Sequence, residues 1–432
     1  MNAPRPTAKR RAMPGPALTR RHALCVLSAL GTASPGLPAA AALSLQTEPG
    51  GPRSVTLPFD LIDNRLFVQA QVHSLAPLHF IFDTGGGNIL DLSVAQKLGL
   101  PLRDGFSMPG AGQGVLPAWR TQVAQASVGG LRMRDLPFVV LPFQALRQAI
   151  GFEQLDGLIG HEVLRRFMVK LDFVRQRITL SEPDQDPGLP PGTTELPIDF
   201  TGNLPHVAGW VDGRAGRLAI DSGDRSSLTL FTPFVDDNHL RQAYPRRFAA
   251  MTGWGVGGPL PAEVTQVQEL LLGPVQVLGV TTRMPTGRGG VFATREVQGS
   301  VGTGVLKRLD VTFDYSRRRV LLASNAHNLR PDPVDHSGLW LSQGEGALVV
   351  AHVSANSPAS SAGLREGDLV LAVNGRPAAD IKLPELRQRW AEHGPGLQVR
   401  LHVAGNVSRA GDAPPREHHL VLRDRWASPR LP

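Results

Sequence analysis

Two short turns in the sequence could do chemistry, because each holds a carboxylate beside a hydroxyl and a glycine. They are Asp83-Thr84-Gly85 and Asp221-Ser222-Gly223. One such turn is a weak signal, since Asp and Gly are common turn residues and the glycine permits a sharp bend. Two copies that meet would bring the carboxylates of Asp83 and Asp221 into contact, and such a pair shares one proton. The pair then offers an acid and a base to a single water molecule.

The segments around these turns also occur twice, in the same order and with nearly constant spacing. The matched pairs are residues 57–60 with 196–199, 79–85 with 217–223, 108–114 with 251–257, 157–160 with 299–302, and 171–173 with 313–315. A duplication of this kind predicts two homologous lobes. A pseudo-twofold axis between them would place Asp83 opposite Asp221.

The runs between these anchors are short, apolar or alternating, and they end at Gly, Pro or Asn. That pattern is typical of β strands and turns. The best helical candidates are residues 92–98 and the short segments at Leu164 and Leu306. The sequence therefore predicts a mainly β, bilobal fold, with lobes at 52–181 and 196–325 and a Pro-rich linker at 182–195.

Length, cysteine content and charge limit the class of protein. A chain of 432 residues is too long for one ordinary core, and its single Cys excludes a disulfide framework and a thiolate-rich metal site. The net charge of +8 would suggest a nucleic-acid partner if it were spread over the chain. Much of it stands in residues 1–40, which hold basic residues and no acid, so we expect no nucleic-acid partner.

The first 42 residues have the composition of an export signal. Basic residues precede the apolar run 23–30, and the alanines at 39–42 form a plausible cleavage site. The segment 19–24 is similar to a twin-arginine signal, and an ordinary secretory signal remains the alternative. The apolar run is too short to cross a bilayer, so we expect a periplasmic or extracellular protein without a stable membrane span.

The first lobe carries a resemblance to a known family. Residues 80–85, 89–93 and 95–100, with the later 158–160 and 171–173, resemble the retropepsin-like aspartyl proteases. The resemblance implies a peptidase that hydrolyses peptide or protein substrates through water, with Asp83 and Asp221 as the catalytic dyad. It implies no metal, no cofactor and no acyl-enzyme. Because both lobes lie in one chain, a monomer could be active.

The resemblance also assigns supporting residues. It implies that the hydroxyls of Thr84 and Ser222 brace the two turns, next to Gly85 and Gly223. Residues 108–114 and 251–258 fall where the family has a flap over the substrate, and a plain surface turn remains the alternative for the second. The candidate flap glycines are Gly110, Gly112, Gly253 and Gly255.

Two departures from the family pattern affect the dyad. Gly86-Gly87 follow the first turn where the family usually has Ala, which should loosen that turn. Asp224 follows the second turn. If its carboxylate points inward, it raises the proton affinity of the dyad and impairs catalysis, whereas an Asp224 that faces solvent is harmless.

The segment after the linker 326–335 has a different pattern. Residues 346–350, 362–364 and 365–375 closely resemble the PDZ domains that are fused to bacterial periplasmic proteases, which implies a PDZ domain at 336–426. Such domains add an extended peptide to their edge strand and bind its C-terminal carboxylate. The resemblance places the helix of that groove at 383–390. It places the carboxylate loop at Gly338, Leu339, Trp340 and Leu341, and the alternative is that these four residues begin the first strand.

Together these features predict an exported aspartic endopeptidase whose PDZ domain binds the C-termini of peptides or proteins. The alternative is a catalytically inactive peptide-binding protein that uses the same cleft and the same PDZ domain. The two hypotheses share fold and location and differ only at Asp83 and Asp221.

Overall fold

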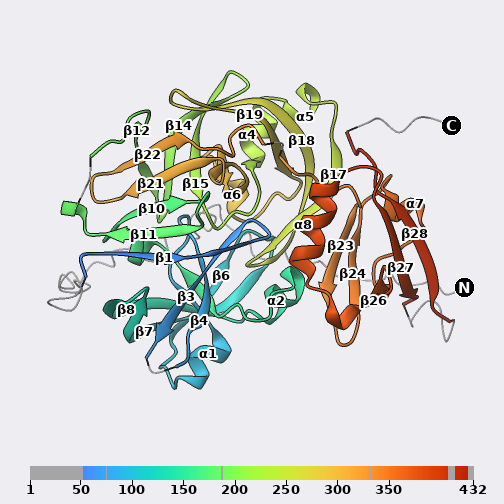
Figure 1. The fold of residues 1–432 in the computed structure, drawn as a ribbon, viewed down its shortest axis with the longest axis horizontal. Coiled ribbons are helices and arrows are strands. Elements are labelled where there is room, and N and C mark those ends of the chain that lie inside the picture. Colours follow the sequence, from blue (N-terminus) through green and yellow to red (C-terminus); the bar gives the residue numbers. More distant parts are fainter. Residues whose placement is uncertain (1–51, 74, 186–187, 331, 407–413, 427–432) are drawn as a thin grey trace, which may run out of the picture.

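The computed structural model describes residues 52–73, 75–185, 188–330, 332–406 and 414–426. The predicted signal peptide at 1–42 lies outside these residues. The described chain is mainly β and forms two lobes followed by a third, smaller body (Figure 1). The prediction of a mainly β, bilobal fold is confirmed. Among the described helices, none is both long and apolar enough to cross a membrane.

The first lobe is built on one eight-stranded sheet with the order β2-β3-β4-β9-β5-β8-β7-β6. Its strands are β2 (Asp60–Ile62), β3 (Arg65–Val72), β4 (Leu78–Phe82), β5 (Ile89–Asp91), β6 (Arg103–Pro109), β7 (Val115–Val128), β8 (Leu131–Leu141) and β9 (Gly157–Ile159). Its helices are α1 (Leu92–Lys97), α2 (Gln144–Ile150) and α3 (His161–Leu164). Of these helices, α2 was not predicted from the sequence.

The second lobe repeats this strand order as β13-β14-β15-β20-β16-β19-β18-β17. Its strands are β13 (Asp199–Thr201), β14 (Leu204–Val211), β15 (Arg214–Asp221), β16 (Leu228–Leu230), β17 (Phe248–Gly255), β18 (Gly258–Leu272), β19 (Val275–Pro285) and β20 (Gly299–Gly302). Its helices are α4 (Thr232–Asp237), α5 (Leu240–Ala243) and α6 (Thr303–Leu306), with a 3-10 turn, η2, at Val291–Ala293.

A six-stranded sheet joins the two lobes. Its order is β1 (Ser54–Pro58), β11 (Arg177–Ser181), β10 (Met168–Asp172), β21 (Leu309–Asp314), β22 (Arg319–Ser324) and β12 (Thr194–Pro197). The central strands β10 and β21 are antiparallel, with Val169 opposite Phe313. The predicted linker 182–195 contains a 3-10 turn, η1 (Pro183–Gln185), and β12 already begins at Thr194. One apolar core runs through both lobes, so they pack as a single unit.

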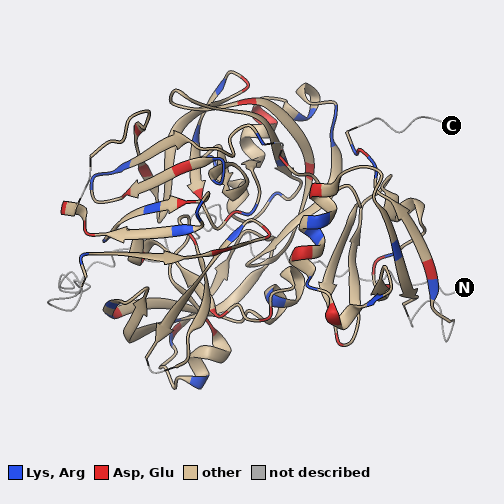
Figure 2. Ribbon diagram, viewed as in Figure 1, with Lys and Arg blue, Asp and Glu red and all other residues tan. Residues whose placement is uncertain are grey.

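The third body has its own apolar core and a sheet with the main order β23-β24-β25-β27-β28. Its strands are β23 (Leu339–Gln343), β24 (Leu348–Val353), β25 (Leu369–Val373), β26 (Arg376–Pro377), β27 (Gln398–Ala404) and β28 (Arg416–Val421). Its helices are α7 (Pro358–Ser361), η3 (Ala378–Asp380) and α8 (Leu383–His393). Helix α8 lies between the sheet of this body and the two lobes (Figure 1). Basic and acidic residues are interspersed in all three bodies (Figure 2).

Candidate active site

The structure brings the two predicted carboxylates together at the interface between the lobes. Asp83 directly follows β4, and Asp221 ends β15. Both strands are buried at this end, and each pairs in parallel with a central strand, β9 or β20, which fixes its position. The Asp221 carboxyl lies against Gly85, and the Asp83 carboxyl lies against Gly223. Each carboxyl group therefore contacts the turn of the other lobe.

The two glycines are needed for space and not for a special backbone conformation. The chain bends at Gly85 and turns at Gly223 as expected, but neither residue has a positive φ, so these bends do not need a conformation that favours glycine. A Cβ on Gly85 would lie 2.5 Å from Cγ of Asp221, and a Cβ on Gly223 would lie 2.4 Å from Cγ of Asp83. Any side chain at either position would push the two carboxyl groups apart.

Thr84 and Ser222 hold the two turns together through four hydrogen bonds. The Thr84 N–H donates to Oγ of Ser222 at 3.0 Å, and the Ser222 N–H donates to Oγ1 of Thr84 at 2.9 Å. The Thr84 hydroxyl donates to the Ile220 carbonyl at 3.0 Å, and the Ser222 hydroxyl donates to the Phe82 carbonyl at 2.7 Å. Both side chains are fully buried. Their pairing fixes the relative position of Asp83 and Asp221.

The environment of the carboxyl groups favours one shared proton. Oδ1 of Asp83 accepts a hydrogen bond from the Gly85 N–H at 3.0 Å, and Oδ1 of Asp221 accepts one from the Gly223 N–H at 2.8 Å. Burial raises the pKa of Asp83 above its ordinary value. Burial, and then the charge of Asp83, raise the pKa of Asp221 well above its ordinary value. The two buried carboxyl groups therefore hold one proton between them, and the pair carries a single negative charge.

Asp224 is buried, yet its charge is compensated. Its Oδ1 accepts from the Arg283 guanidinium at 3.0 Å and from the Ser226 N–H at 2.9 Å, and its Oδ2 accepts from the Thr229 hydroxyl at 2.8 Å. Burial alone would raise the pKa of Asp224, but Arg283 and these hydrogen bonds hold it below its ordinary value. The structure matches the inward alternative, because Asp224 is buried and its charge adds to the effect of burial in raising the pKa of both Asp83 and Asp221.

The glycine pair after the first turn has a steric role that the sequence did not reveal. A Cβ on Gly86 would lie 2.6 Å from Oδ2 of Asp83, so an alanine there would crowd the carboxylate. The Gly86 carbonyl accepts a hydrogen bond from the His161 N–H at 2.9 Å, which ties the turn to α3. The turn is therefore fixed at this point, contrary to the expectation that these glycines loosen it.

Several supporting residues carry no local sequence signal. The Tyr315 hydroxyl donates to the Thr84 carbonyl at 2.9 Å and so supports the first turn from the second lobe. The rings of Phe200 and His161 lie against Tyr315, with centroids 4.9 and 5.7 Å away. Burial lowers the pKa of His161 to about 4, so this ring stays neutral at pH 7. It acts as part of an aromatic cluster.

Both predicted flap segments form the tips of β hairpins, and the two tips meet. Strands β6 and β7 enclose residues 110–114, and strands β17 and β18 enclose residues 256–257. The Gly112 N–H donates to the Val256 carbonyl at 2.9 Å, and the Gly114 N–H donates to the Gly257 carbonyl at 2.8 Å. A Cβ on Gly110 would lie 2.3 Å from the Val256 carbonyl oxygen, so the tips can meet only because these residues are glycines.

The tips cover a cavity of about 240 Å³ that contains both carboxylates. Its walls combine apolar residues of both hairpins with residues of the two turns, and they include Met108, Gly110, Gly253, Trp254, Gly255, Asp83 and Asp221. Nη1 of Arg283 is buried there and, among the described residues, finds no hydrogen-bond partner.

Comparison with known proteins assigns two of the three bodies. Residues 68–163 match an aspartyl protease family, and residues 349–401 match a PDZ domain. The chain carries an aspartyl protease domain and a PDZ domain. The first match covers most of the first lobe, including Asp83, and ends before the second lobe. No curated protein matches the chain.

The predicted carboxylate loop of the PDZ domain lies at the start of its edge strand. Gly338 has a φ of +74°, and Leu339, Trp340 and Leu341 begin β23 with buried side chains. Leu339, Trp340 and Leu341 thus belong to the first strand, and their role in binding a carboxylate stays a prediction. Among the described residues, no three His, Cys, Asp or Glu side chains group in a way that could hold a metal ion.

Proposed function

We propose that the protein is an exported aspartic endopeptidase that hydrolyses peptide bonds through a water molecule activated by Asp83 and Asp221. The observation that carries this proposal is the contact of each carboxyl group with the glycine of the opposite turn, which leaves one proton for two acids. The aspartyl protease domain supports a peptidase of this class. The basic and apolar segment at 1–42 supports export.

The proposed reaction assigns different roles to the two acids. Ionised Asp83 takes a proton from water as the water oxygen attacks the scissile carbonyl carbon, and protonated Asp221 gives its proton to the carbonyl oxygen. The resulting gem-diol then receives a proton on its nitrogen from Asp83, the C–N bond breaks, and one hydroxyl proton returns to Asp221. The products are a carboxylic acid and an amine, and the dyad regains its starting state.

In the proposed cycle the two hairpins act as lids over an extended substrate. Separation of the tips breaks the hydrogen bonds of Gly112 and Gly114 and the bond from the Val291 N–H to the Gly110 carbonyl at 3.3 Å. Closure over a peptide excludes bulk water from the acids and strengthens the electrostatic interactions of the site. The apolar walls of the cavity favour apolar side chains beside the scissile bond.

The mature protein is expected to cleave an unbiased mixture of peptides in a range of pH that includes mildly acidic values. The test compares the protein with its Asp83→Asn variant on the same mixture from pH 3 to pH 8, with mass spectrometry of the products. Cleavage by the first protein and none by the variant supports the aspartic mechanism. Cleavage by neither, when both are folded and bind peptides, would instead support the inactive peptide-binding protein.

A further inference from the structure

The peptide groove of the PDZ domain faces the protease lobes. In PDZ domains an incoming peptide adds to the edge strand of the sheet. The edge strand here is β23, and α8 lies across from it. The guanidinium of Arg387, on α8, donates to the Leu341 carbonyl of β23 at 2.8 Å. The space that a peptide would enter is therefore bounded by Leu341, Arg387 and Trp340.

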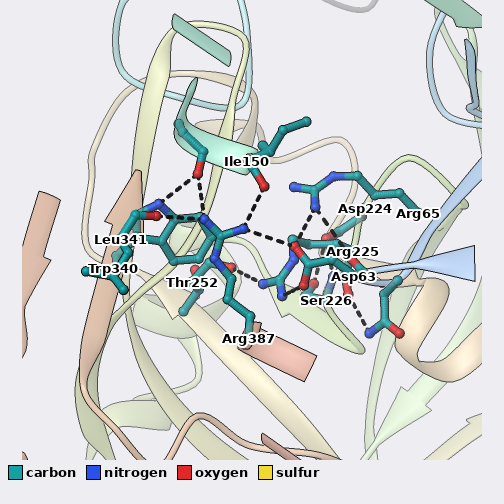
Figure 3. Close-up of polar contacts among 12 residues, drawn as sticks. Asp63, Arg65, Ile150, Asp224, Arg225, Ser226, Thr252, Trp340, Leu341 and Arg387 are labelled. Carbon is teal, nitrogen blue, oxygen red and sulfur yellow. Dashed lines mark hydrogen bonds and ion pairs between the residues drawn. The ribbon is translucent and has the colours of Figure 1, made fainter. Parts of the chain in front are cut away.

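The C-terminal end of helix α2 from the first lobe occupies one side of this groove (Figure 3). Arg387 donates to the carbonyls of Ile150 and Ala149, both at 2.7 Å, and the Trp340 indole N–H donates to the Ala149 carbonyl at 3.2 Å. The last carbonyls of a helix have no partner within the helix and carry a partial negative charge. They offer Arg387 the same kind of acceptor as the carboxylate of a peptide.

Arg387 is also linked to the aspartyl protease domain by a chain of charged groups. Nη1 of Arg387 lies 3.8 Å from Oδ2 of Asp63, and Asp63 also forms an ion pair with Arg225 (Figure 3). Burial alone would raise the pKa of Asp63, but Arg225, Arg65 and Arg387 hold it below its ordinary value. Arg225 directly follows Asp224 and donates to the Thr252 carbonyl of β17 at 2.8 Å. Strand β17 forms one side of the second hairpin.

A cavity of about 210 Å³ beside this contact leaves room for a chain end. Trp340, Arg387 and Trp390 line it from the PDZ domain, and Arg225 and Lys307 line it from the second lobe. Lys307 is partly buried, and its ammonium group donates to Oδ1 of Asn64 at 3.0 Å. Four acidic residues, Asp63, Asp332, Asp335 and Glu392, also line this cavity, so its charges are mixed. For Arg387 itself, a full carboxylate charge would be a stronger acceptor than the partial charge of a helix end.

We propose that the PDZ domain binds the C-terminal end of α2 in its own peptide groove. A peptide with a free C-terminal carboxylate competes with α2 for this groove, and its binding releases the second hairpin. The link to cleavage rests on the proposed peptidase function, whereas the competition for the groove does not. A second contact, outside the groove, joins the PDZ domain to the start of β17, so the release concerns the part of that strand near Thr252. In this second contact Arg425 donates to the Ala249 carbonyl at 2.8 Å, and its guanidinium lies 4.0 Å from the centre of the Phe248 ring.

A larger side chain at Gly151 tests the contact between α2 and the PDZ domain without replacing a residue of the groove. Gly151 ends α2 with a φ of +71°, and a Cβ there would lie 2.5 Å from Cβ of Leu383 on α8. Gly151→Asn keeps a residue that tolerates this backbone conformation and forces α8 away. The matched control is Gly99→Asn, because Gly99 follows the end of α1 with a φ of +62° and a Cβ there would contact nothing within 4 Å.

Binding is measured in the Asp83→Asn background, so that the result does not depend on catalysis. The probe is a pool of random decapeptides with free carboxylate ends, and the same pool with amidated ends is the comparison. Gly151→Asn should bind the free-ended pool at least about tenfold more tightly than the parent, because a larger fraction of the protein has an open groove. Gly99→Asn should bind like the parent. Equal binding by both variants, or equal binding of amidated peptides, would overturn the proposal.

Amide hydrogen exchange of residues 248–255 supplies the second readout. Exchange there should be at least about tenfold faster in Gly151→Asn than in Gly99→Asn, because the chain through Asp63 and Arg225 is broken. Arg387→Met should accelerate the same exchange but should not tighten peptide binding, since the groove has lost its arginine. If Gly151→Asn does not fold, hydrogen exchange and peptide binding of Arg387→Met test the proposal. Unchanged exchange in Arg387→Met would contradict the link between the PDZ domain and the hairpin.

Discussion

Asp221→Asn should abolish peptide-bond hydrolysis and, at the same time, make the folded protein more stable at pH 7. Without the proton of Asp221 the scissile carbonyl loses its acid, and the rate should fall by about 10³-fold or more. The gain in stability arises because the pKa of Asp221 in the folded protein stands well above its ordinary value. The raised pKa means that Asp221 costs the folded protein free energy at pH 7. An asparagine at this position does not ionise in either state, so the variant avoids this cost.

The sign of the stability effect follows from proton linkage. In the unfolded chain Asp221 ionises near its ordinary pKa of about 3.9, whereas in the folded protein it keeps its proton to higher pH. Above the unfolded pKa the folded state binds more protons, so rising pH favours unfolding until the folded pKa is passed. The free energy of unfolding of Asp221→Asn at pH 7 should therefore exceed that of the parent.

Urea unfolding at pH 4 and pH 7, together with peptide cleavage, measures both effects. The control is Asp172→Asn, because hydrogen bonds and the charge of Arg175 hold the pKa of Asp172 below its ordinary value against the effect of burial. That control should keep its cleavage activity and should be no more stable than the parent. Retained turnover in a folded Asp221→Asn would show that Asp221 is not the acid.

Arg283→Met should lower the free energy of unfolding by about 3–5 kcal/mol, because it leaves the buried carboxylate of Asp224 without its cation. The two side chains are 5% and 6% exposed, and their closest atoms are 3.0 Å apart. The double variant Arg283→Met/Asp224→Asn should recover most of the loss, since no buried charge is left unpaired. Urea unfolding of both single variants and the double variant gives the coupling energy.

An exposed ion pair of the same lobe is the control for this cycle. Arg295 and Asp237 pair with side chains that are 70% and 52% exposed, so Arg295→Met should change the free energy of unfolding by less than about 1 kcal/mol. A similar small effect of Arg283→Met would mean that Asp224 does not depend on Arg283. The compensation of charge beside the dyad would then need another explanation.

The repeated anchors predicted the arrangement of the lobes because each anchor is local. An apolar strand, an Asp, a hydroxyl and a glycine stand side by side in the sequence, and two copies imply a pair of facing turns. The mainly β fold and the PDZ domain were predictable for the same reason. The steric need for a glycine at position 85 could not be predicted from the sequence, because the obstacle to a side chain there is Asp221, a residue of the other lobe.

The residues that the sequence did not single out act over long separations. Arg283 stands 59 positions from Asp224, on a strand whose pattern is that of any half-buried strand. The contact of Arg387 with the Ala149 carbonyl joins residues 238 positions apart and uses a backbone atom, which no side-chain pattern can report. Tyr315 likewise reaches the Thr84 carbonyl from the other lobe. Such contacts depend on how complete helices and strands pack against one another, so a local sequence pattern does not predict them.

Hydrolysis by a water molecule held between Asp83 and Asp221 is tested most directly by peptide cleavage in H₂¹⁸O, with enzyme in excess over peptide. Attack by water held between Asp83 and Asp221 predicts one ¹⁸O in each new carboxyl group after a single turnover and no label in either aspartate. Attack by an aspartate itself would form an anhydride, and hydrolysis at the aspartate carbon of that anhydride would place ¹⁸O in the Asp83 or Asp221 side chain and leave the first product unlabelled. That second result, or no cleavage at all by folded protein, would contradict the account.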